Sequence, residues 1–472
     1  MSGSNKVNYG DDSPIAAFAT TPGNSALTMI RCSGKGAFDL LSSIFTPSVK
    51  DMPGNTVIHG WILADNKKID EIVLSVFRSP KSYTGEDSFD ICCHGGYSAG
   101  KAVMTVLKNA GFRDALPGEF TFRAFMNGKL DLTKSESIME LVSAKTETSL
   151  RHAVSRLCGS LQNEINEIKN LLVQVLSSAE IYLDYSEDEI SAEFDAEASD
   201  EIAGRLPSRD IALAALDRLK KLSASWQLER IYQEGVTLVI AGRPNAGKSS
   251  LFNSFLKEDR SIVTEVPGTT RDWIEAFVSI KGVPVRLIDT AGLRDTSDSV
   301  EQIGVERSRQ MLQEADIILY LIDGVQGLTN EDKKFIEQEK SNIKNDSNDR
   351  CLFVWNKADI TAAPDGFINV SAKTGAGIEE LYTSITSIIS KQAGQLHDEL
   401  STAALGTIRQ KNLVDAAYSA LEEAISLADK EDPLDLIAPL LRDAVNSLGE
   451  ITGEVSTADI LEEMFSRFCV GK

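Results

Sequence analysis

The sequence predicts a multidomain protein in which an α/β domain is inserted into a discontinuous all-α helical domain, behind an α+β domain at the N-terminus. Its 472 residues suffice for about three units at roughly 150 residues each. Helical periodicity occurs on both sides of residues 231–391, and strand-like runs alternate with helical runs inside that range. A separate C-terminal helical bundle is the alternative that the sequence leaves open.

Changes in apolar pattern along the chain separate its segments. Short apolar runs broken by glycine and proline, such as 26–30 and 72–77, are typical of an α+β domain. Apolar residues at three- and four-residue spacing predict helices at 135–185 and again at 401–468. The predicted domains are 1–127, 128–230, 231–391 and 392–472.

The segment between the two helical regions has the pattern of a parallel sheet. Nearly continuous apolar runs alternate with helical stretches, as expected for strands covered on both faces. The predicted strands are 236–240, 285–288, 317–322, 351–355 and 368–370.

Charge and cysteine content exclude several classes of protein. The formal net charge is −22 and the sequence pI about 4.7, which argues against a general electrostatic nucleic-acid binder. Any RNA contact would need a local basic patch. Residues 184–201 hold nine carboxylates without a basic residue, and we interpret them as a solvated surface segment in preference to a calcium site.

The cysteines and the apolar runs indicate a cytoplasmic protein. Six cysteines are scattered without a framework spacing, as expected for reduced thiols. Cys92, Cys93 and His94 resemble a metal cluster, but neighbours on a strand point to opposite faces, so we predict core packing. There is no N-terminal signal segment and no apolar run long enough to span a bilayer, so no membrane association is expected.

Residues 242–249, Gly-Arg-Pro-Asn-Ala-Gly-Lys-Ser, match the Walker A spacing directly after a predicted strand and before a helical stretch. Glycines let backbone amides approach phosphate groups, and the helix N-terminus adds positive potential. Lys248 is expected to reach the β- and γ-phosphates, and Ser249 to ligate Mg²⁺.

Two further segments complete the phosphate and magnesium machinery. Asp289-Thr-Ala-Gly292 follows a predicted strand, where the carboxylate can hold the Mg²⁺ shell and the glycine amide can sense the γ-phosphate. Gly268-Thr-Thr-Arg-Asp272 has the pattern of a switch segment, with Thr270 the candidate second Mg²⁺ ligand.

The base-binding segment selects guanine. In Asn356-Lys-Ala-Asp359 the Asp359 carboxylate can accept hydrogen bonds from N1–H and the 2-amino group of guanine, which adenine cannot offer. Ser371-Ala-Lys373 completes the pocket, which makes the domain a Ras-like P-loop G domain. The candidate GTP-binding residues are Asn245, Ala246, Gly247, Lys248, Ser249, Ser250, Thr264, Glu265, Val266, Pro267, Gly268, Thr269, Thr270, Asp289, Thr290, Ala291, Gly292, Asn356, Lys357, Asp359, Ser371, Ala372 and Lys373.

The position after Gly292 is Leu293, where Ras-like proteins carry the glutamine that orients the attacking water. Hydrolysis must therefore use another group. The candidates are the carboxylate of Glu301 and a monovalent cation near the phosphates, to which Asn245 can offer a carbonyl. A solvated helix-end residue is the alternative interpretation of Glu301.

These residues, with four further segments, resemble the tRNA modification GTPases of the MnmE (TrmE) type over nearly the whole chain. The segments are Lys81-Ser-Tyr-Thr-Gly-Glu-Asp87, His94-Gly-Gly96, Pro117-Gly-Glu-Phe-Thr-Phe-Arg-Ala-Phe-Met-Asn-Gly-Lys-Leu-Asp131 and Cys469-Val-Gly-Lys472. The resemblance implies an N-terminal domain that dimerises and binds 5-formyl- or 5,10-methylene-tetrahydrofolate, with Arg31, Glu86, Lys129 and Lys472 around the folate.

The same resemblance implies roles for the hydrolysis residues. Asn245, Thr264, Val266 and Thr269 would surround a K⁺ ion that activates the G domain when two G domains meet, and Glu301 would orient the water. Cys469 would act in the active site. A prenylation signal or a frayed tail are the other interpretations of the last four residues.

The implied partners are a second copy of the chain, tRNA, and an FAD-dependent protein of the MnmG (GidA) type that forms a heterotetramer or a larger complex with the dimer. Together they would add an aminomethyl or carboxymethylaminomethyl group to C5 of the wobble uridine, while GTP hydrolysis drives conformational change. The alternative is a ribosome-assembly GTPase, which shares the Asn-containing phosphate loop and the missing glutamine. A dynamin-like membrane GTPase is not supported by any strongly cationic amphipathic helix.

Overall fold

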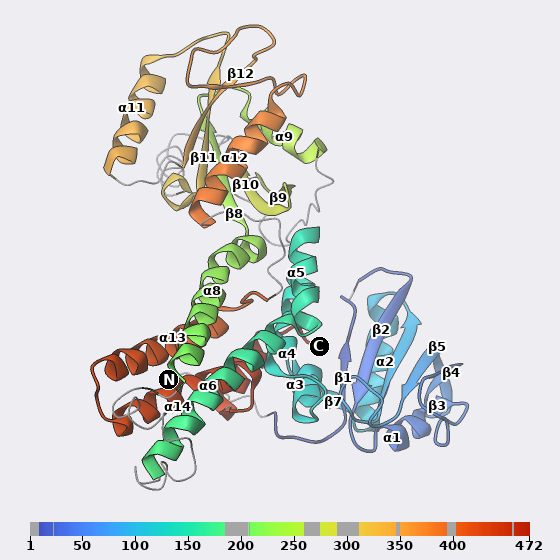
Figure 1. The fold of residues 1–472 in the computed structure, drawn as a ribbon. Coiled ribbons are helices and arrows are strands. Elements are labelled where there is room, and N and C mark those ends of the chain that lie inside the picture. Colours follow the sequence, from blue (N-terminus) through green and yellow to red (C-terminus); the bar gives the residue numbers. More distant parts are fainter. Residues whose placement is uncertain are drawn as a thin grey trace, which may run out of the picture. The chain divides into compact units, whose positions relative to one another are not determined.

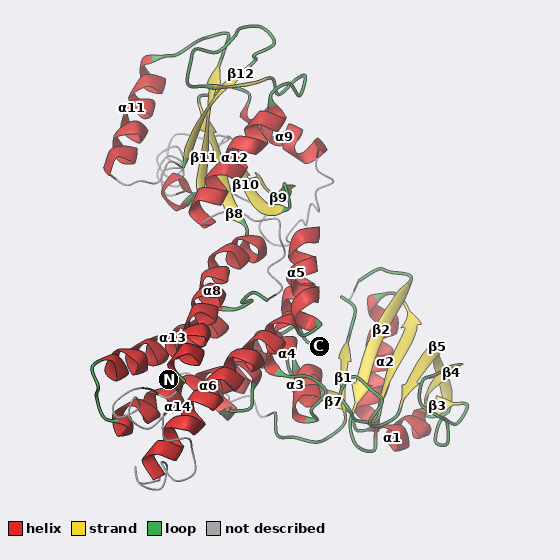
Figure 2. Ribbon diagram, in the orientation of Figure 1, coloured by secondary structure: helices red, strands yellow, loops and turns green. Residues whose placement is uncertain are grey.

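The computed structural model describes residues 9–21, 23–184, 206, 208–258, 274–289, 311–345, 350–393, 403–455 and 457–472. These form two compact units, the first made of residues 1–139 and 445–472 and the second of 140–444. Figure 1 follows the chain and Figure 2 shows its helices and strands. The acidic segment that we interpret as a solvated surface lies almost wholly outside the described residues.

The first unit contains a seven-stranded sheet in the order β3-β4-β5-β6-β2-β1-β7. All neighbours are antiparallel except β1 and β7. The strands are β1 (Ile15–Phe18), β2 (Leu27–Ser33), β3 (Phe45–Thr46), β4 (Thr56–Ala64), β5 (Lys67–Phe77), β6 (Ser88–His94) and β7 (Arg113–Asp114). The short apolar runs at 26–30 and 72–77 thus lie largely on strands, as predicted.

Helices α1 (Ala37–Ile44) and α2 (Tyr97–Ala110) pack on this sheet. Ile30, Ile91 and Leu74 lie opposite one another on three neighbouring strands and are fully buried. Each such side chain contributes about 1.5–3 kcal/mol when removed from water. Cys93 is buried in the same core, whereas Cys92 is on the opposite face. This burial confirms the prediction of core packing for Cys93. Within the described residues no group of three His, Cys, Asp or Glu could hold a metal ion.

Four more helical segments belong to the first unit. They are α3 (Glu119–Met126), α15 (Ala458–Ser466) and parts of α4 (Leu132–Ser143) and α14 (Leu434–Thr452), within which the division between units falls. Aromatic rings join α3 to α15 in what we call the aromatic cluster. Its members are Tyr9, Phe122, Phe125, Phe465 and Phe468.

The second unit brings together helices from both ends of the chain's middle region. They are α5 (Glu147–Leu157), α6 (Ser160–Asp184), α8 (Arg209–Glu234) and α13 (Ile408–Asp429). Ser223 Oγ on α8 donates to Asp415 Oδ1 on α13 at 2.7 Å. Because α8 precedes and α13 follows the α/β domain, the helical domain is discontinuous as predicted, and the separate C-terminal bundle is wrong.

A buried group of charges ties the helices together, and we call it the helical charge cluster: Glu140, His152, Arg156 and Glu229. Arg156 on α5 donates to Glu140 Oε2 at 2.7 Å and to Glu229 Oε2 on α8 at 2.8 Å. Burial raises the pKa of Glu229, but the hydrogen bond from His152 and the Arg156 charge outweigh it, so the pKa lies below its usual value.

The part of the chain that follows α8 and precedes α13 in the sequence forms a six-stranded sheet in the order β13-β12-β11-β8-β10-β9. Its strands are β8 (Val236–Gly242), β9 (Ile274–Ile280), β10 (Val283–Asp289), β11 (Ile317–Asp323), β12 (Cys351–Asn356) and β13 (Ile368–Val370). All pairs are parallel except β9 with β10. The five predicted strands are confirmed, while β9 is a strand that the sequence analysis did not identify.

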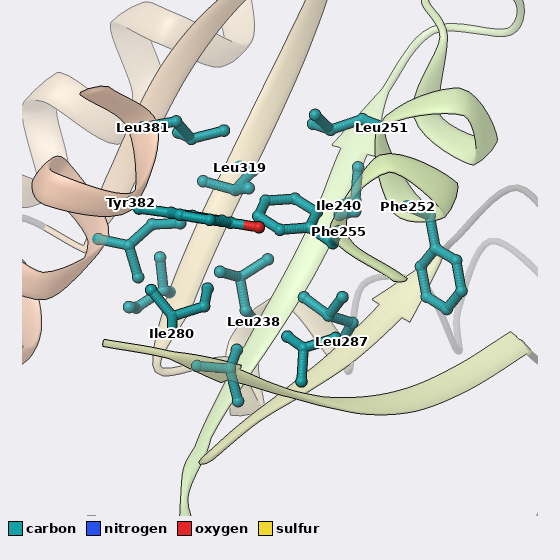
Figure 3. Close-up of a cluster of buried hydrophobic side chains, with 14 of the residues drawn as sticks. Leu238, Ile240, Leu251, Phe252, Phe255, Ile280, Leu287, Leu319, Leu381 and Tyr382 are labelled. Atoms are coloured by element: carbon teal, nitrogen blue, oxygen red, sulfur yellow. The ribbon is translucent and has the colours of Figure 1, made fainter. Parts of the chain in front are cut away.

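Helices cover both faces of this sheet, which explains its continuous apolar strands. Leu238 and Ile240 of β8 pack against α9 (Lys248–Glu258) and α12 (Ile378–Ala393), through residues such as Leu251, Phe255 and Tyr382 (Figure 3). Val239 and Ala241 point to the other face, where α11 (Asn330–Asn345) adds Phe335 and Ile336. Side chains of period two thus fill two separate cores.

The helical charge cluster predicts a large difference between two arginine substitutions. Arg156→Met leaves Glu140 and Glu229 buried without their cation, so we expect a loss of about 3–5 kcal/mol in unfolding free energy. Arg218 pairs with Glu164 and Glu167 while partly exposed, and Arg218→Met should cost only about 0–1 kcal/mol. Urea unfolding followed by circular dichroism compares the two. Equal losses would contradict a structural role for the cluster.

Candidate functional site

The phosphate loop connects β8 to α9, as its spacing predicts. Gly247 has a φ of 97°, and a Cβ atom there would overlap the side-chain amide nitrogen of Asn356. Glycine is therefore required at 247 both by backbone conformation and by lack of space. Asn245 also lies in the left-handed region, with a φ of 63°, and is exposed.

The lysine and serine of the loop are held by neighbours in the domain. Lys248 is only 8% exposed, and its Nζ donates to the carbonyls of Gly242 and Arg243 at 3.0 and 2.9 Å. Ser249 Oγ donates to Asp289 Oδ2 at 3.0 Å. The structure therefore brings together the predicted Ser249 in the first turn of α9 and the predicted Asp289 at the C-terminal end of β10.

Asn356 joins the phosphate loop to the predicted base-binding segments. Its Nδ2 donates to the carbonyl of Ala246 at 2.8 Å, and its Oδ1 accepts from the amide of Ala372 at 3.1 Å. The side chain is 3% exposed, so both bonds are shielded from water. Asp359 and Lys373 are exposed on the two segments that Asn356 connects, and the Ser371 amide is held by the carbonyl of Ala376.

Asp323 is a residue of this region that the sequence analysis missed. It ends β11, and its Oδ2 accepts from Lys357 Nζ at 2.7 Å while Oδ1 accepts from the amide of Val325 at 2.9 Å. Although burial raises the pKa of Asp323, these hydrogen bonds lower it below its usual value. Lys357 has a φ of 65°, an unfavourable conformation for lysine that such a bond can hold. A carboxylate directly after a buried strand was the available signal.

Several predicted residues lie outside the described residues and have no structural account. They are Glu301 and the GTP-binding positions Thr264, Glu265, Val266, Pro267, Gly268, Thr269, Thr270, Thr290, Ala291 and Gly292. Of the K⁺ set only Asn245 is described, and of the two Mg²⁺ ligands only Ser249. The exposed Ser250 follows on α9.

A second group of predicted residues meets in the first unit. The segment Cys469–Lys472, which we call the tail, is held by hydrogen bonds from the amides of Gly118 and Lys472 to the carbonyl of Cys469, both 3.3 Å. Burial and the nearby Arg31 charge lower the pKa of Lys472. Lys472 is thus within electrostatic range of Arg31, whose Nε is paired with Asp90 Oδ1 at 3.1 Å, and the hydrogen bonds of the tail make its interpretation as frayed wrong.

Glu86 and Lys129 connect to the same region through successive contacts. Glu86 accepts from Ser33 Oγ on β2 at 2.7 Å and from Arg123 on α3 at 3.2 Å. Ser33 is two residues from Arg31 and therefore on the same face of β2. Lys129 donates to the carbonyl of Pro80 at 3.0 Å, at the start of the loop that carries Glu86.

Two cations beside these predicted residues also escaped the sequence analysis as candidates. Arg123 is buried and binds both Glu86 and the fully buried Glu119, to which Arg113 donates as well. Glu119 and Arg123 are four residues apart on α3, but Glu86 and Arg113 lie on other elements, so only the fold brings the four together. The carboxylate of Glu86 is therefore fixed by a charge network and not by packing alone.

Comparison with known proteins identifies the family. A model described as the MnmE helical domain matches residues 132–469, and one described as the TrmE N-terminus of a GTP-binding protein matches 14–129. The chain is 42% identical to the tRNA modification GTPase MnmE of Treponema denticola over 99% of both chains. It belongs to the MnmE family. The MnmE of Carboxydothermus hydrogenoformans is 38% identical, over 97% of this chain and 99% of its own.

Among solved structures, Era of Aquifex aeolicus is similar over 39% of this chain and 66% of its own, with 24% identity and a TM-score of 0.26. Within the described residues, no helix is both long and apolar enough to cross a membrane.

The contact between Asp323 and Lys357 predicts an effect on nucleotide binding. Asp323→Asn removes the charge that holds the lysine, and a hydrogen bond to a charged group contributes about 1.5–3 kcal/mol. We therefore expect GDP to bind at least about tenfold more weakly, measured by titration calorimetry. Asp365→Asn, at an exposed position of the same domain, is the control. An unchanged affinity in Asp323→Asn would show that Lys357 needs no such support.

Proposed function

We propose that this protein is a GTP hydrolase that acts in tRNA modification. The observation that carries the proposal is the relation to MnmE proteins over 99% of both chains, because it includes the flanking domains as well as the G domain. A ribosome-assembly GTPase would share only the G domain motifs, so that alternative is not retained.

The phosphate loop provides the groups that a nucleotide needs. Lys248 Nζ is held by two backbone carbonyls, and phosphate oxygens can replace them as partners. The backbone amides at the start of α9 favour negative charge at the same place. These groups would fix the phosphates in one orientation and stabilise charge that develops during hydrolysis.

The hydroxyl of Ser249 and the carboxylate of Asp289 fit Mg²⁺, which prefers hard oxygen ligands. The two oxygens are 3.0 Å apart beside the phosphate loop, and this closeness supports a shared site for one ion. Ser249 would bind the ion directly, together with Thr270, and Asp289 would hold its water shell. When bound, Mg²⁺ neutralises phosphate charge.

Guanine selection would rest on Asp359 and its supports. The exposed Asp359 carboxylate can accept two hydrogen bonds from guanine, while Lys357 covers the base plane. Asn356 fixes this segment to the phosphate loop at Ala246, so the base and phosphate sites keep a constant separation. Ser371, Ala372 and Lys373 would close the pocket from the other side.

For hydrolysis we propose a K⁺ ion and Glu301 in place of the usual glutamine. Leu293 has no group that could orient water. The left-handed backbone of Asn245 is a conformation that can turn its carbonyl toward a ligand, and Thr264, Val266 and Thr269 would complete the K⁺ shell. Because such an ion acts as a fixed charge, it can supply part of the stabilisation of the transition state.

For the carbon chemistry we propose a tetrahydrofolate donor, 5-formyl or 5,10-methylene, bound by Arg31, Glu86, Lys129 and Lys472. The successive contacts that connect Glu86 to Ser33 and Lys129 to Pro80 support the proposal, as does the influence of the Arg31 charge on the pKa of Lys472. Cys469 would contribute its exposed thiol. The residues would orient the donor, and an FAD-dependent MnmG-type partner would supply the redox chemistry.

In this scheme a cytoplasmic homodimer works with that partner on tRNA. The product would carry an aminomethyl or carboxymethylaminomethyl group at C5 of the wobble uridine. GTP hydrolysis would drive a conformational change and not the carbon transfer itself.

The proposed function predicts a change in tRNA composition. In cells lacking this protein, mass analysis of tRNA nucleosides should show wobble uridine without its C5 group, and the wild-type gene should restore it. Lys248→Ala should fail to restore it because it removes the phosphate-binding cation. Lys333→Ala, an exposed lysine of the G domain, should restore it fully. Normal modification in the deletion strain would refute the function.

The proposed hydrolysis mechanism predicts two separate losses. Replacing K⁺ by Na⁺ should lower GTP turnover at least about tenfold, because the smaller ion fits the carbonyl shell poorly. Glu301→Ala should leave GDP affinity unchanged and lower turnover about a hundredfold, the scale of a lost water-orienting group. Unchanged turnover in Na⁺ would remove the cation from the mechanism, and equal loss of binding and turnover would exclude Glu301 as its catalytic group.

A further inference from the structure

The N-terminus of α3 has an unusual contact with the end of α15. Gly118 is the N-cap residue of α3, in the left-handed conformation with a φ of 66°. A Cβ atom there would lie 2.7 Å from the carbonyl oxygen of Phe465 and 2.8 Å from the Cβ of Phe468. Both distances are too short for real atoms. The last turn of α15 therefore rests directly on the backbone of Gly118.

The same glycine is bonded to the tail. Its amide donates to the carbonyl of Cys469 at 3.3 Å. Gly118 therefore contacts both the end of α15 and the first residue of the tail. Phe465 and Phe468 are buried in the aromatic cluster, which prevents the end of α15 from sliding sideways. The distance between the tail and α3 is therefore set by the absence of a side chain at Gly118.

A second close approach directs the far end of the tail. A Cβ atom at Gly471 would overlap the carbonyl oxygen of Phe18, the last residue of β1. Strand β1 pairs with β2, where Phe18 lies opposite Ile30, the neighbour of Arg31. The tail therefore lies against β1, the neighbour of the strand that carries Arg31, and the Arg31 charge contributes to the lowered pKa of Lys472.

We propose that Gly118 is a positioning residue for the tail, which it seats so that Cys469 and Lys472 reach the site of Arg31 and Glu86. The proposal rests on the folate site of the proposed function and adds what holds its two halves together. A methyl group at 118, 2.7 Å from the Phe465 carbonyl oxygen, would have to push that carbonyl away by at least about 0.3 Å. Cys469 follows Phe465 by four residues, so that displacement is passed on to the tail.

The chain offers a matched control for this substitution. Gly36 is also a helix N-cap in the left-handed conformation, with a φ of 80°, but a Cβ atom there would meet nothing within 4 Å. Gly36→Ala therefore introduces the same backbone strain at the same kind of position without touching the tail. A difference between Gly118→Ala and Gly36→Ala reports the contact and not the strain.

Two measurements on the full-length protein test the proposal. Hydrogen exchange of the peptide covering 463–472 should be at least about tenfold faster in Gly118→Ala than in wild type, and within about twofold of wild type in Gly36→Ala. Equilibrium dialysis with 5-formyltetrahydrofolate should show at least about tenfold weaker binding in Gly118→Ala only. GTP turnover, measured as a check on folding, should be retained in both variants because the phosphate loop lies in the other unit.

The outcomes separate this proposal from the proposed function. If wild type fails to bind 5-formyltetrahydrofolate, the folate site is wrong, while the exchange rates still decide whether Gly118 seats the tail. If the two variants behave alike in exchange and binding, the positioning role of Gly118 is overturned. Should Gly118→Ala fail to fold, Phe468→Ala removes the ring that anchors the end of α15 in the aromatic cluster while leaving Gly118 unchanged. It should loosen the tail and weaken binding equally, and a tail unchanged in Phe468→Ala would equally overturn the proposal.

Discussion

The contact between Arg156 on α5 and Glu229 on α8 is the interaction on which the second unit depends. It holds α8 against α5, and α8 also packs against α13 through Ser223 and Asp415. The same helix leads into β8 with only Gly235 between them. A Cβ atom at Gly235 would lie 2.5 Å from the carbonyl of Pro284 on β10, so the junction has no room to bend freely. At its N-terminal end, the inserted domain is therefore attached to the helical domain through α8.

That attachment extends to the nucleotide site through the sheet. β8 leaves α8 and ends at the phosphate loop, so the position of Lys248 is determined by a strand whose beginning is fixed. A second connection runs from the helical segment to β9, where Lys145 Nζ lies 4.1 Å from the centre of the Phe277 ring and donates to the carbonyl of Glu234. β9 begins immediately after the segment predicted as a switch. Contacts of this kind are what a hydrolysis-driven change would have to alter.

The sequence predicted the G domain well because its motifs are local. The phosphate loop needs a strand, a tight turn and a helix in succession, and all three are encoded within about twenty residues. β9 was missed because, as an antiparallel edge strand, its apolar residues are interrupted by Glu275 and Ser279 and do not form the continuous run that marked its neighbours. Asp323 was missed for a different reason: its role depends on Lys357, which lies 34 residues further on.

The tail illustrates why the rest could not be predicted. Nothing in Cys469-Val-Gly-Lys472 itself distinguishes a seated segment from a frayed one, because the deciding contact is with Gly118, far away in the sequence. The resemblance to the family indicated the function of the tail, but only the fold shows how it is held. Glu119 and Arg123 stand four residues apart on α3 and could be paired from spacing alone, but their contacts with Arg113 and Glu86 on other elements could not.

The net charge of the whole chain does not describe the charge around an individual site. A net charge of −22 suggests repulsion of anionic ligands, yet Arg31, Lys129 and Lys472 belong to one connected region of the first unit. At physiological ionic strength a charge is screened within about 8 Å, so a ligand in that region experiences these cations and not the average. Burial and then the Arg31 charge lower the pKa of Lys472, while Arg31 itself is paired with Asp90 at 3.1 Å. An anionic ligand bound in this region would favour the charged form of Lys472 and so oppose both effects.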